Sequence, residues 1–237
     1  SLVTAGISYI TTPLYTRILP AEVFGNVSVF MTWLQIFGII AMFCLSYGVF
    51  NNGMMDFPKQ RDEYSFSMLV LSNLITLGFS GLLFLLRPFL EKYAKLPIEQ
   101  VVLMICVFVF QPAYNFWNAR QRFEYKYKWT MFWAIFCAFI SPSVAIIAIV
   151  LSRDKLNARI FGAEIPLIIV YAGFYLYIAR KARFRLNRSF WKSALIFNFP
   201  LIPHYLSTYM LNSSDKLMIS ALVNDTAVAY YSVAYSV

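Results

Sequence analysis

The stretch ALIFNFPLIPHYLSTYMLNSSDKLMISALV, from Ala194 to Val223, decides how the rest of the sequence is interpreted. About 20 apolar residues, each rising 1.5 Å along a helix, cross the hydrocarbon core of a bilayer. The stretch is long enough to do so, yet it carries Asp215 and Lys216 well inside it. Because ionisable side chains are costly at that depth, we interpret the pair as a candidate functional feature of a membrane-spanning helix.

The same stretch begins a second copy of an earlier pattern. Shifting the sequence by 204 positions lays LPAEVFGNVSV, Leu19–Val29, over VNDTAVAYYSV, Val223–Val233, and both copies have a turn followed later by Ser-Val. We therefore expect a six-helix lobe over residues 1–192 and the start of a second, repeat-related lobe over residues 193–237. The chain begins at Ser1 and stops within the apolar run SVAYSV, so we expect a piece of a longer protein.

The composition predicts an all-α polytopic membrane protein. The 237 residues are 60% hydrophobic and only 13% charged, and the mean hydropathy is +0.63. A soluble domain has about 25% charged residues. The net charge of +9 lies mostly in the links between apolar runs, where it sets topology, so no nucleic-acid partner is expected. The three cysteines lie singly in apolar runs, and no disulfide, metal site or cofactor is predicted.

Seven apolar runs have the length of spans. They are residues 2–19, 24–50, 66–86, 97–117, 129–151, 160–179 and 194–223. The links after the second, fourth and sixth runs hold twelve Lys and Arg residues, against seven on the other side, where Arg17 at the end of the first run is counted with the links. The positive-inside rule therefore places the even-numbered links in the cytoplasm. The most basic of them is RKARFRLNRSFWK, from Arg180 to Lys192.

The first run carries a polar stripe. At 100° per residue, one side of its helix holds Thr4, Ser8, Thr11, Thr12 and Tyr15. Such a stripe faces protein or water rather than lipid. Arg17 falls roughly opposite, although Pro13 bends an ideal helix and shifts that angle.

Two segments resemble a known family. TPLYTRILPAEVFGNVSV, Thr12–Val29, resembles the signature near the start of polysaccharide (O-antigen) flippases of the multidrug/oligosaccharidyl-lipid/polysaccharide exporter superfamily. There a Pro-Leu-x-x-Arg-x-Leu run precedes an acidic-aromatic-Gly turn. FPLIPHYLSTYMLNSSDKLMIS, Phe199–Ser220, is similar to the seventh helix of that family, with a Pro-Leu-x-Pro run and then Ser-Asp-Lys. The two segments occur in the family's order.

The resemblance implies both a fold and an activity. The fold would have two six-helix lobes that open alternately to the two sides, and this chain would be the first lobe plus the start of the second. The activity would move an oligosaccharide linked to a polyprenyl diphosphate from the inner to the outer leaflet of a bacterial cytoplasmic membrane. Such a protein is a transporter rather than an enzyme. Its partners would be the lipid-linked oligosaccharide, membrane lipids, and a coupling proton or sodium ion.

The resemblance also suggests how cationic residues act. Arg17 matches the signature arginine and would bind phosphate through its planar fork. The alternative is that Arg17 only reaches the outer membrane interface. Asp215 and Lys216 are adjacent, so on a helix they diverge by about 100°, and one would face a cavity while the other faces a neighbouring helix or the interface. Lys216 is a candidate substrate contact and Asp215 a candidate ion-coupling residue; the alternative is a structural ion pair.

The remaining candidates have simpler alternatives. Asn115 recurs with Gln111 and Asn118 at near-helical spacing and would bind sugar hydroxyls, or else bond to a neighbouring helix. Arg120 lies at the predicted cytoplasmic mouth and would recruit a diphosphate, although the positive-inside rule alone explains it. His204, the only histidine, would touch a sugar or fill a polar gap beside Pro203.

Two other functions remain open. A cation-coupled drug exporter of the same superfamily would carry an acid in the membrane core of its first lobe, and only Glu164 lies within one of the first six runs, near its outer end. A membrane-embedded glycosyl or acyl transferase needs a base or metal ligands, such as Asp-x-Asp or a histidine with a nearby carboxylate, and this stretch of sequence has neither. The flippase is the favoured interpretation.

Overall fold

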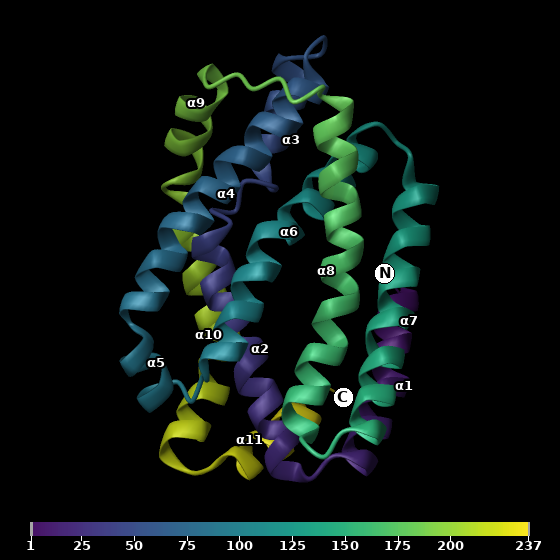
Figure 1. Ribbon diagram of the computed structural model, residues 1–237, viewed down its shortest axis with the longest axis vertical. Helices are drawn as coiled ribbons and strands as arrows, with labels where there is room; N and C mark the ends of the chain where they lie inside the picture. The colour runs from purple at the N-terminus through teal and green to yellow at the C-terminus, as the bar shows by residue number, and fades with distance from the viewer. Residues whose placement is uncertain (1, 237) are drawn as a thin grey trace. The chain divides into compact units, whose positions relative to one another are not determined.

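The computed structural model describes the backbone of residues 2–236 and the side chains there, apart from those of residues 2–5, 8–10 and 236. Within this range every regular element is a helix, which confirms the all-α prediction (Figure 1). In chain order the helices are α1 Leu2–Ile18, α2 Ala21–Ala41, α3 Gly48–Asp56, α4 Arg61–Leu85, α5 Arg87–Tyr93, α6 Ile98–Phe123, α7 Tyr127–Leu151, α8 Lys155–Lys181, α9 Ser189–Asn198, α10 Leu201–Leu222 and α11 Asp225–Ser236.

Five of these helices have the length and apolar character of membrane spans. They are α2, α4, α6, α7 and α8, with 21 to 27 residues each. Helix α1 has 17 residues, slightly fewer than a typical span. Helix α10 has 22 residues, but its histidine, its serines and the Asp215–Lys216 pair lower its hydropathy. The chain is a multi-pass membrane protein.

The second predicted span is interrupted. The apolar run over residues 24–50 was expected to form one helix, but α2 ends at Ala41 and α3 begins at Gly48. Between them Phe43 and Cys44 have φ angles of 54° and 50°, a left-handed conformation that stops a helix. The Asn198 side-chain amide donates a hydrogen bond of 3.0 Å to the Phe43 carbonyl, so a residue distant in sequence stabilises this break.

The seventh predicted span is also divided. Helix α9 ends at Asn198 and α10 begins at Leu201, with Pro200 in the gap. Phe199 still has helical φ and ψ angles of −52° and −48°. Proline lacks a backbone N–H and so cannot make the next helical hydrogen bond, which ends α9. Pro203 is tolerated because it lies in the first turn of α10, where its missing N–H would have no helical partner.

The described chain divides into two compact units, which are considered separately. Unit 1 comprises Ser1–Ile36, Met131–Leu167 and Thr208–Val237, and unit 2 comprises Phe37–Thr130 and Ile168–Ser207. Four helices, α2, α7, α8 and α10, contribute residues to both units.

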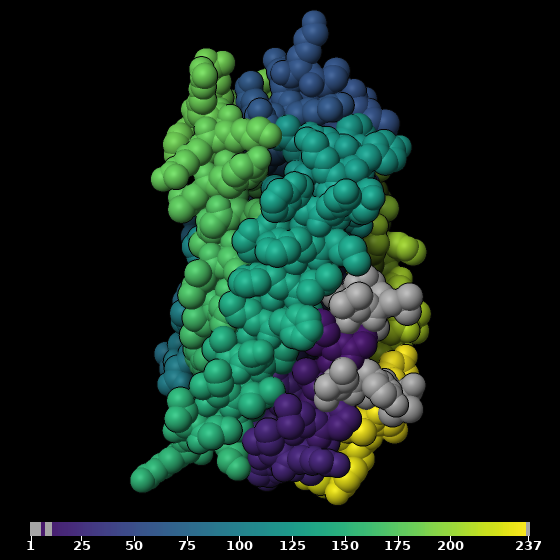
Figure 2. Space-filling view, turned by 90° about the vertical axis from the view of Figure 1, so that its right-hand side faces the viewer, coloured from purple at the N-terminus to yellow at the C-terminus, as the bar shows by residue number. Residues whose placement is uncertain are grey.

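In unit 1, α1 packs on α7 and on the start of α8. Buried Tyr15 of α1 and Leu19, which directly follows α1, form a cluster with Ala145 and Ile149 of α7 and with Ala163 of α8. Figure 2 shows residues of α1, in purple, directly against those of α7, in teal. Gly162 permits the close approach of α8, because a Cβ at this position would press on the Ala145 and Ala148 atoms of α7.

In unit 2, α4 packs along α6, and α3 and α9 cover one end of that pair (Figure 1). An aromatic cluster holds this end together: Phe50, Phe57, Tyr64, Phe116 and Phe190. The Tyr64 hydroxyl donates to the Val49 carbonyl at 3.1 Å, so α4 is also hydrogen-bonded to α3. The Trp191 indole N–H donates to the Ser67 carbonyl at 3.0 Å and fixes α9 on α4.

Candidate anion-binding cavity

Unit 1 contains a cavity of about 560 Å³. Four helices line it: α1, α2, α8 and α10. Half of its lining residues carry a hydroxyl group, and the others are three apolar, one amide and two cationic side chains: Thr11, Thr12, Tyr15, Phe24, Val27, Ser28, Met31, Thr32, Gln35, Arg159, Tyr209 and Lys216. A polar cavity among helices of a membrane protein suits a ligand with charged and hydrogen-bonding groups.

The lining from α1 is the predicted polar stripe. Thr11, Thr12 and Tyr15 all border the cavity, which confirms that this side faces away from lipid. Thr4 and Ser8, assigned to the same stripe, lie outside the side chains that the structure describes. Arg17 is exposed and does not border the cavity, in agreement with its expected place on another side of α1.

The lining from α2 offers hydrogen-bond acceptors. The Ser28 hydroxyl donates to the Phe24 carbonyl at 3.1 Å, and the Thr32 hydroxyl donates to the Ser28 carbonyl at 2.9 Å. A hydroxyl has a single hydrogen, and here each hydrogen is already donated to a backbone carbonyl. The Ser28 and Thr32 oxygens can therefore only accept hydrogen bonds from a ligand. The donors to an anion must therefore come from the other walls.

Arg159 supplies one positive charge to the cavity. Its guanidinium lies over the Tyr15 ring, 4.1 Å from the ring centroid, which is within the range of a cation–π contact. Its Nη1 atom is buried and has no hydrogen-bond partner among the described residues. An unpaired guanidinium nitrogen is costly to bury, so this atom is suited to an anionic acceptor.

The sequence interpretation missed Arg159. It was counted with the basic residues of a loop, because the sixth span was expected to begin at Ile160. In the structure α8 begins five residues earlier, at Lys155. The Asp154 carboxylate accepts a hydrogen bond of 3.2 Å from the Asn157 backbone N–H, as an N-terminal cap does. The Ser-Arg-Asp sequence before Lys155 was the signal that locates this helix start.

Lys216 supplies the second positive charge, and its neighbour points elsewhere. Lys216 borders the cavity, whereas Asp215 is exposed and accepts a 2.7 Å hydrogen bond from the Tyr231 hydroxyl of α11. This confirms that the adjacent pair diverges, with one side chain toward a cavity and the other toward a neighbouring helix. The roles assigned to the two residues stay predictions.

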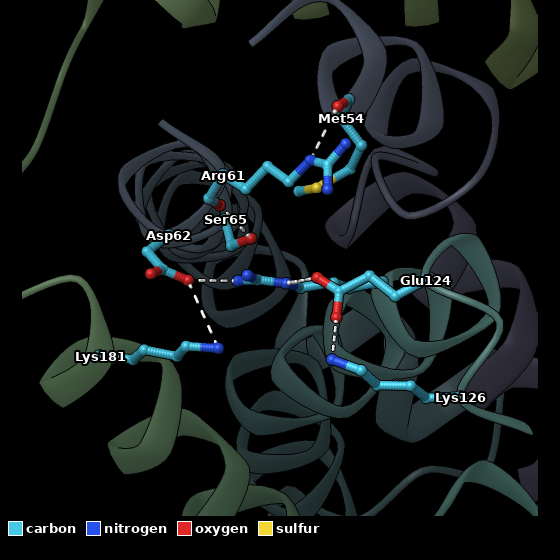
Figure 3. A network of polar contacts seen from close by, with 8 residues as sticks. Met54, Arg61, Asp62, Ser65, Glu124, Lys126 and Lys181 are labelled. Carbon is cyan, nitrogen blue, oxygen red and sulfur yellow. Dashed lines mark hydrogen bonds and ion pairs between the residues drawn. The ribbon is translucent and has the colours of Figure 1, made fainter. Parts of the chain in front are cut away.

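Arg120 lies in unit 2 within a network of ion pairs (Figure 3). Its Nη1 and Nε atoms bond the carboxylates of Asp62 and Glu124, at 2.5 and 2.8 Å. Lys181 lies 3.6 Å from Asp62, and Lys126 lies 2.6 Å from Glu124. Figure 3 shows Asp62 and Lys181 on one side of the network and Glu124 and Lys126 on the other. Two donors of Arg120 are thus engaged with carboxylates.

The network joins three links of the sequence. Asp62 follows the second predicted span, Glu124 follows the fourth and Lys181 follows the sixth. The positive-inside rule assigned these three links to one side of the membrane, and the ion pairs bring them together in unit 2. The adjoining cavity is only about 10 Å³, room for about one water molecule. It is far smaller than the cavity of unit 1.

A comparison with protein families identifies the group to which the chain belongs. The model of the family described as "Polysaccharide biosynthesis protein" matches residues 1–237, the whole of the chain. The chain belongs to this polysaccharide biosynthesis family. No curated protein and no solved structure matches the chain. The match confirms the family suggested by the segments around Arg17 and Asp215.

Family membership and the apolar helices together define the broad role. This polysaccharide biosynthesis protein is a multi-pass membrane protein that acts in export during polysaccharide synthesis. The cavity of unit 1, with about 560 Å³, is far larger than the space of about 10 Å³ beside Arg120. Among the described residues no group of three or more His, Cys, Asp or Glu side chains is placed to hold a metal ion.

Glu124 stays ionised in this polysaccharide biosynthesis protein at any ordinary pH. Burial alone would raise its pKa, but hydrogen bonds from Lys126 and Arg120 outweigh it and lower the pKa from 4.5 to about 2. The carboxylate therefore remains a charged partner of Arg120 down to strongly acidic pH.

The other predicted contacts lie in unit 2. Asn115 is half-buried on α6. Tyr114 and Trp117, beside Asn115 on α6, pack against each other and against Tyr171 and Phe174 of α8. His204 is exposed at the start of α10, with its ring against Tyr205. Of the five predicted site residues, the structure brings only Lys216 to the cavity of unit 1.

Proposed function

We propose that the chain is the N-terminal part of a flippase that moves a polyprenyl-diphosphate-linked oligosaccharide from the inner to the outer leaflet of the bacterial cytoplasmic membrane. Residues 1–192 would form its first lobe, and residues 193–237 would begin the second. The family membership supports a role in polysaccharide export. The resemblance of Thr12–Val29 and Phe199–Ser220 to flippase segments supports the lipid-linked substrate.

The cavity is the observation that carries this proposal. A diphosphate head group cannot cross hydrocarbon unaided, so a flippase needs a polar space with positive charge. The cavity of unit 1 has about 560 Å³ and two cationic side chains, Arg159 and Lys216. Small-molecule sites have about 300–1,000 Å³, so the cavity is large enough for a head group while the polyprenyl chain stays in lipid.

Asp215 remains our proposed ion-coupling residue. Its carboxylate is exposed and hydrogen-bonded to Tyr231 of α11. A proton or sodium ion on Asp215 would alter that hydrogen bond and with it the contact between α10 and α11. Arg17, Arg120 and Asn115 remain proposed contacts for the head group at stages of transport that this conformation does not represent.

A second candidate function is a cation-coupled drug exporter. It is favoured by one observation: Glu164 is only 8% exposed, within the cluster of helices in unit 1. Because α8 begins at Lys155, Glu164 lies almost three turns inside the helix rather than near its end. A buried acid in the first lobe is what such an exporter requires. In this candidate Glu164→Gln abolishes drug tolerance.

The deciding experiment follows the lipid-linked oligosaccharide in cells that lack the full-length protein. A membrane-impermeant reagent that modifies sugars reports which leaflet the labelled lipid occupies. We expect inner-leaflet accumulation, reversed by the wild-type protein and by the matched control Arg153→Gln, whose arginine is exposed in the link before α8. Arg159→Gln and Arg17→Ala should not reverse it. If the lipid-linked oligosaccharide is normally exposed on the outer leaflet in the deleted cells and drug tolerance is altered, the drug-exporter function would replace the proposed flippase function.

A further inference from the structure

Resting on the proposed function, we infer that Tyr15 holds Arg159 in the orientation in which Arg159 and Lys216 together bind the diphosphate of a glycosyl diphosphate. Tyr15 is a positioning residue, and the two cations are the binding groups. The three residues come from α1, α8 and α10 and border one cavity.

The stacking geometry leaves the hydrogen-bond donors of Arg159 available. A guanidinium is planar, and its five N–H groups point outward in that plane. The Tyr15 ring, 4.1 Å away, covers one face of the plane and takes none of the donors. Nη1 is buried without a partner among the described residues, and Arg159 borders the cavity, so a small rotation of the side chain would bring an unused donor to an anion there.

Tyr15 is itself held firmly. It is 5% exposed and packs in the cluster that joins α1, α7 and α8. Its hydroxyl donates to the Pro142 carbonyl of α7 at 3.3 Å. A ring fixed at two points cannot follow the arginine as it moves, so the ring limits the rotamers open to Arg159 and keeps the guanidinium at the cavity wall.

The charges and acceptors of the lining select the ligand class. Arg159 and Lys216 favour a group with more than one negative charge. The Ser28 and Thr32 oxygens can accept hydrogen bonds but cannot donate them to a phosphate. They suit the hydroxyl groups of the first sugar, so a diphosphate joined to a sugar fits better than a bare lipid phosphate.

The inference is tested by titrating the purified full-length protein in detergent with inorganic pyrophosphate in a calorimeter. Arg159→Gln and Lys216→Gln should each weaken binding about tenfold or more, because each removes a charged donor. The matched controls Arg153→Gln and Lys192→Gln remove exposed cations outside the cavity and should leave binding within about twofold. Unchanged affinity in Arg159→Gln overturns the inference, as does wild-type protein that binds no pyrophosphate.

The positioning role of Tyr15 has its own readout. Tyr15→Phe keeps the ring over the guanidinium and should bind pyrophosphate nearly as well as wild type. Tyr15→Leu should weaken binding, yet it should add little when Arg159 is already glutamine, because the two side chains act as one unit. Fully additive losses would show that Tyr15 does not act through Arg159. If Tyr15→Leu does not purify, Arg159→Lys replaces it: its ammonium keeps the charge without the planar fork, and wild-type affinity would contradict the stacking role.

The source of the diphosphate is distinguished by competition. Polyprenyl diphosphate in neutral phospholipid vesicles should compete with pyrophosphate for the wild-type protein. If pyrophosphate binds but polyprenyl diphosphate does not compete, the Arg159–Lys216 site is supported and the proposed function is overturned. Conversely, if Arg159→Gln moves the lipid-linked oligosaccharide to the outer leaflet as well as the wild-type protein does, the Arg159–Lys216 site is overturned and the proposed function stands.

Discussion

Glu124 shows how one carboxylate contributes to stability in a way that depends on pH. Its pKa is lowered from 4.5 to about 2 by Lys126 and Arg120 despite burial, so the folded state binds its proton more weakly than the unfolded state. The stabilisation is fully present above pH of about 4.5 and is lost as the pH falls toward 2.

We therefore expect Glu124→Gln to lower the stability of the protein at pH 7 by on the order of 1 kcal/mol, because the ion pairs remain partly exposed. Thermal unfolding in detergent should show a difference from wild type that is constant from pH 7 to about 5 and shrinks below pH 4.5. Glu99→Gln, in the exposed first turn of the same helix α6, is the control. A difference that grows on acidification contradicts the explanation.

For individual residues, the sequence predicted the type of side chain better than it predicted where that side chain lies in the fold. It identified Lys216 and the α1 hydroxyls, because charge inside an apolar run and a helical stripe are visible in one dimension. It missed Arg159, since a helix start displaced by five residues turned a cavity residue into a loop residue. The Asp62 partner of Arg120 could not be foreseen, because it is 58 positions away and only the fold brings the two together.

Gly25 controls the contact between two elements, the first turns of α2 and the start of α11. A Cβ at this position would overlap the backbone carbonyl of Asp225, the first residue of α11. The two helix starts lie at corresponding places in the weak repeat, so the contact joins the turns that open each copy. Only glycine permits this approach without backbone movement.

Gly25→Ala should destabilise the protein by about 1–3 kcal/mol, the usual cost of overpacking. Gly78→Ala is the matched control: Gly78 lies in α4 with no atom within 4 Å of its added Cβ, so alanine there should be neutral or slightly stabilising. The measurement is thermal unfolding of the full-length variants in detergent. Equal unfolding temperatures for the two variants would show that α11 does not press on α2.

The apolar runs predicted that helices form but not where they break. The turn at residues 42–47, which includes Phe43 and Cys44, contains no Gly or Pro, and the Asn198 amide that holds the turn comes from a different helix. The division at Pro200 was available from the sequence, since the proline was visible and every proline lacks the backbone N–H that a continuing helix needs. We nevertheless predicted one continuous span over residues 194–223, because the apolar run is long enough to cross a membrane.

The orientation of the whole molecule in the membrane follows from its links. Three even-numbered links meet through Asp62, Arg120 and Lys181 in unit 2. In unit 1 the end of α1, next to the first link, meets the fifth link, since the Lys155 ammonium donates to the Ile18 carbonyl at 3.5 Å. Each pairing joins links of the same parity, as expected if the spans cross alternately.

We predict that Lys126 faces the cytoplasm and Arg153 the outside. Both side chains are exposed, so single cysteines there should react with thiol reagents in a protein whose Cys44, Cys106 and Cys137 are replaced by serine or alanine. In intact cells an impermeant reagent should label Arg153→Cys and spare Lys126→Cys until the membrane is opened. The opposite order would invert the topology, and equal labelling would contradict the alternation.

The most direct test of the account is transport by the purified full-length protein in vesicles. A fluorescent sugar joined to polyprenyl diphosphate is placed in both leaflets, and an impermeant quencher reports the fraction that reaches the outer leaflet. We predict that quenching proceeds beyond the outer-leaflet fraction with wild-type protein and with Arg153→Gln, and slows at least tenfold with Arg159→Gln. Quenching that stops at the outer-leaflet fraction with the wild-type protein would contradict the proposal that it moves a lipid-linked diphosphate sugar.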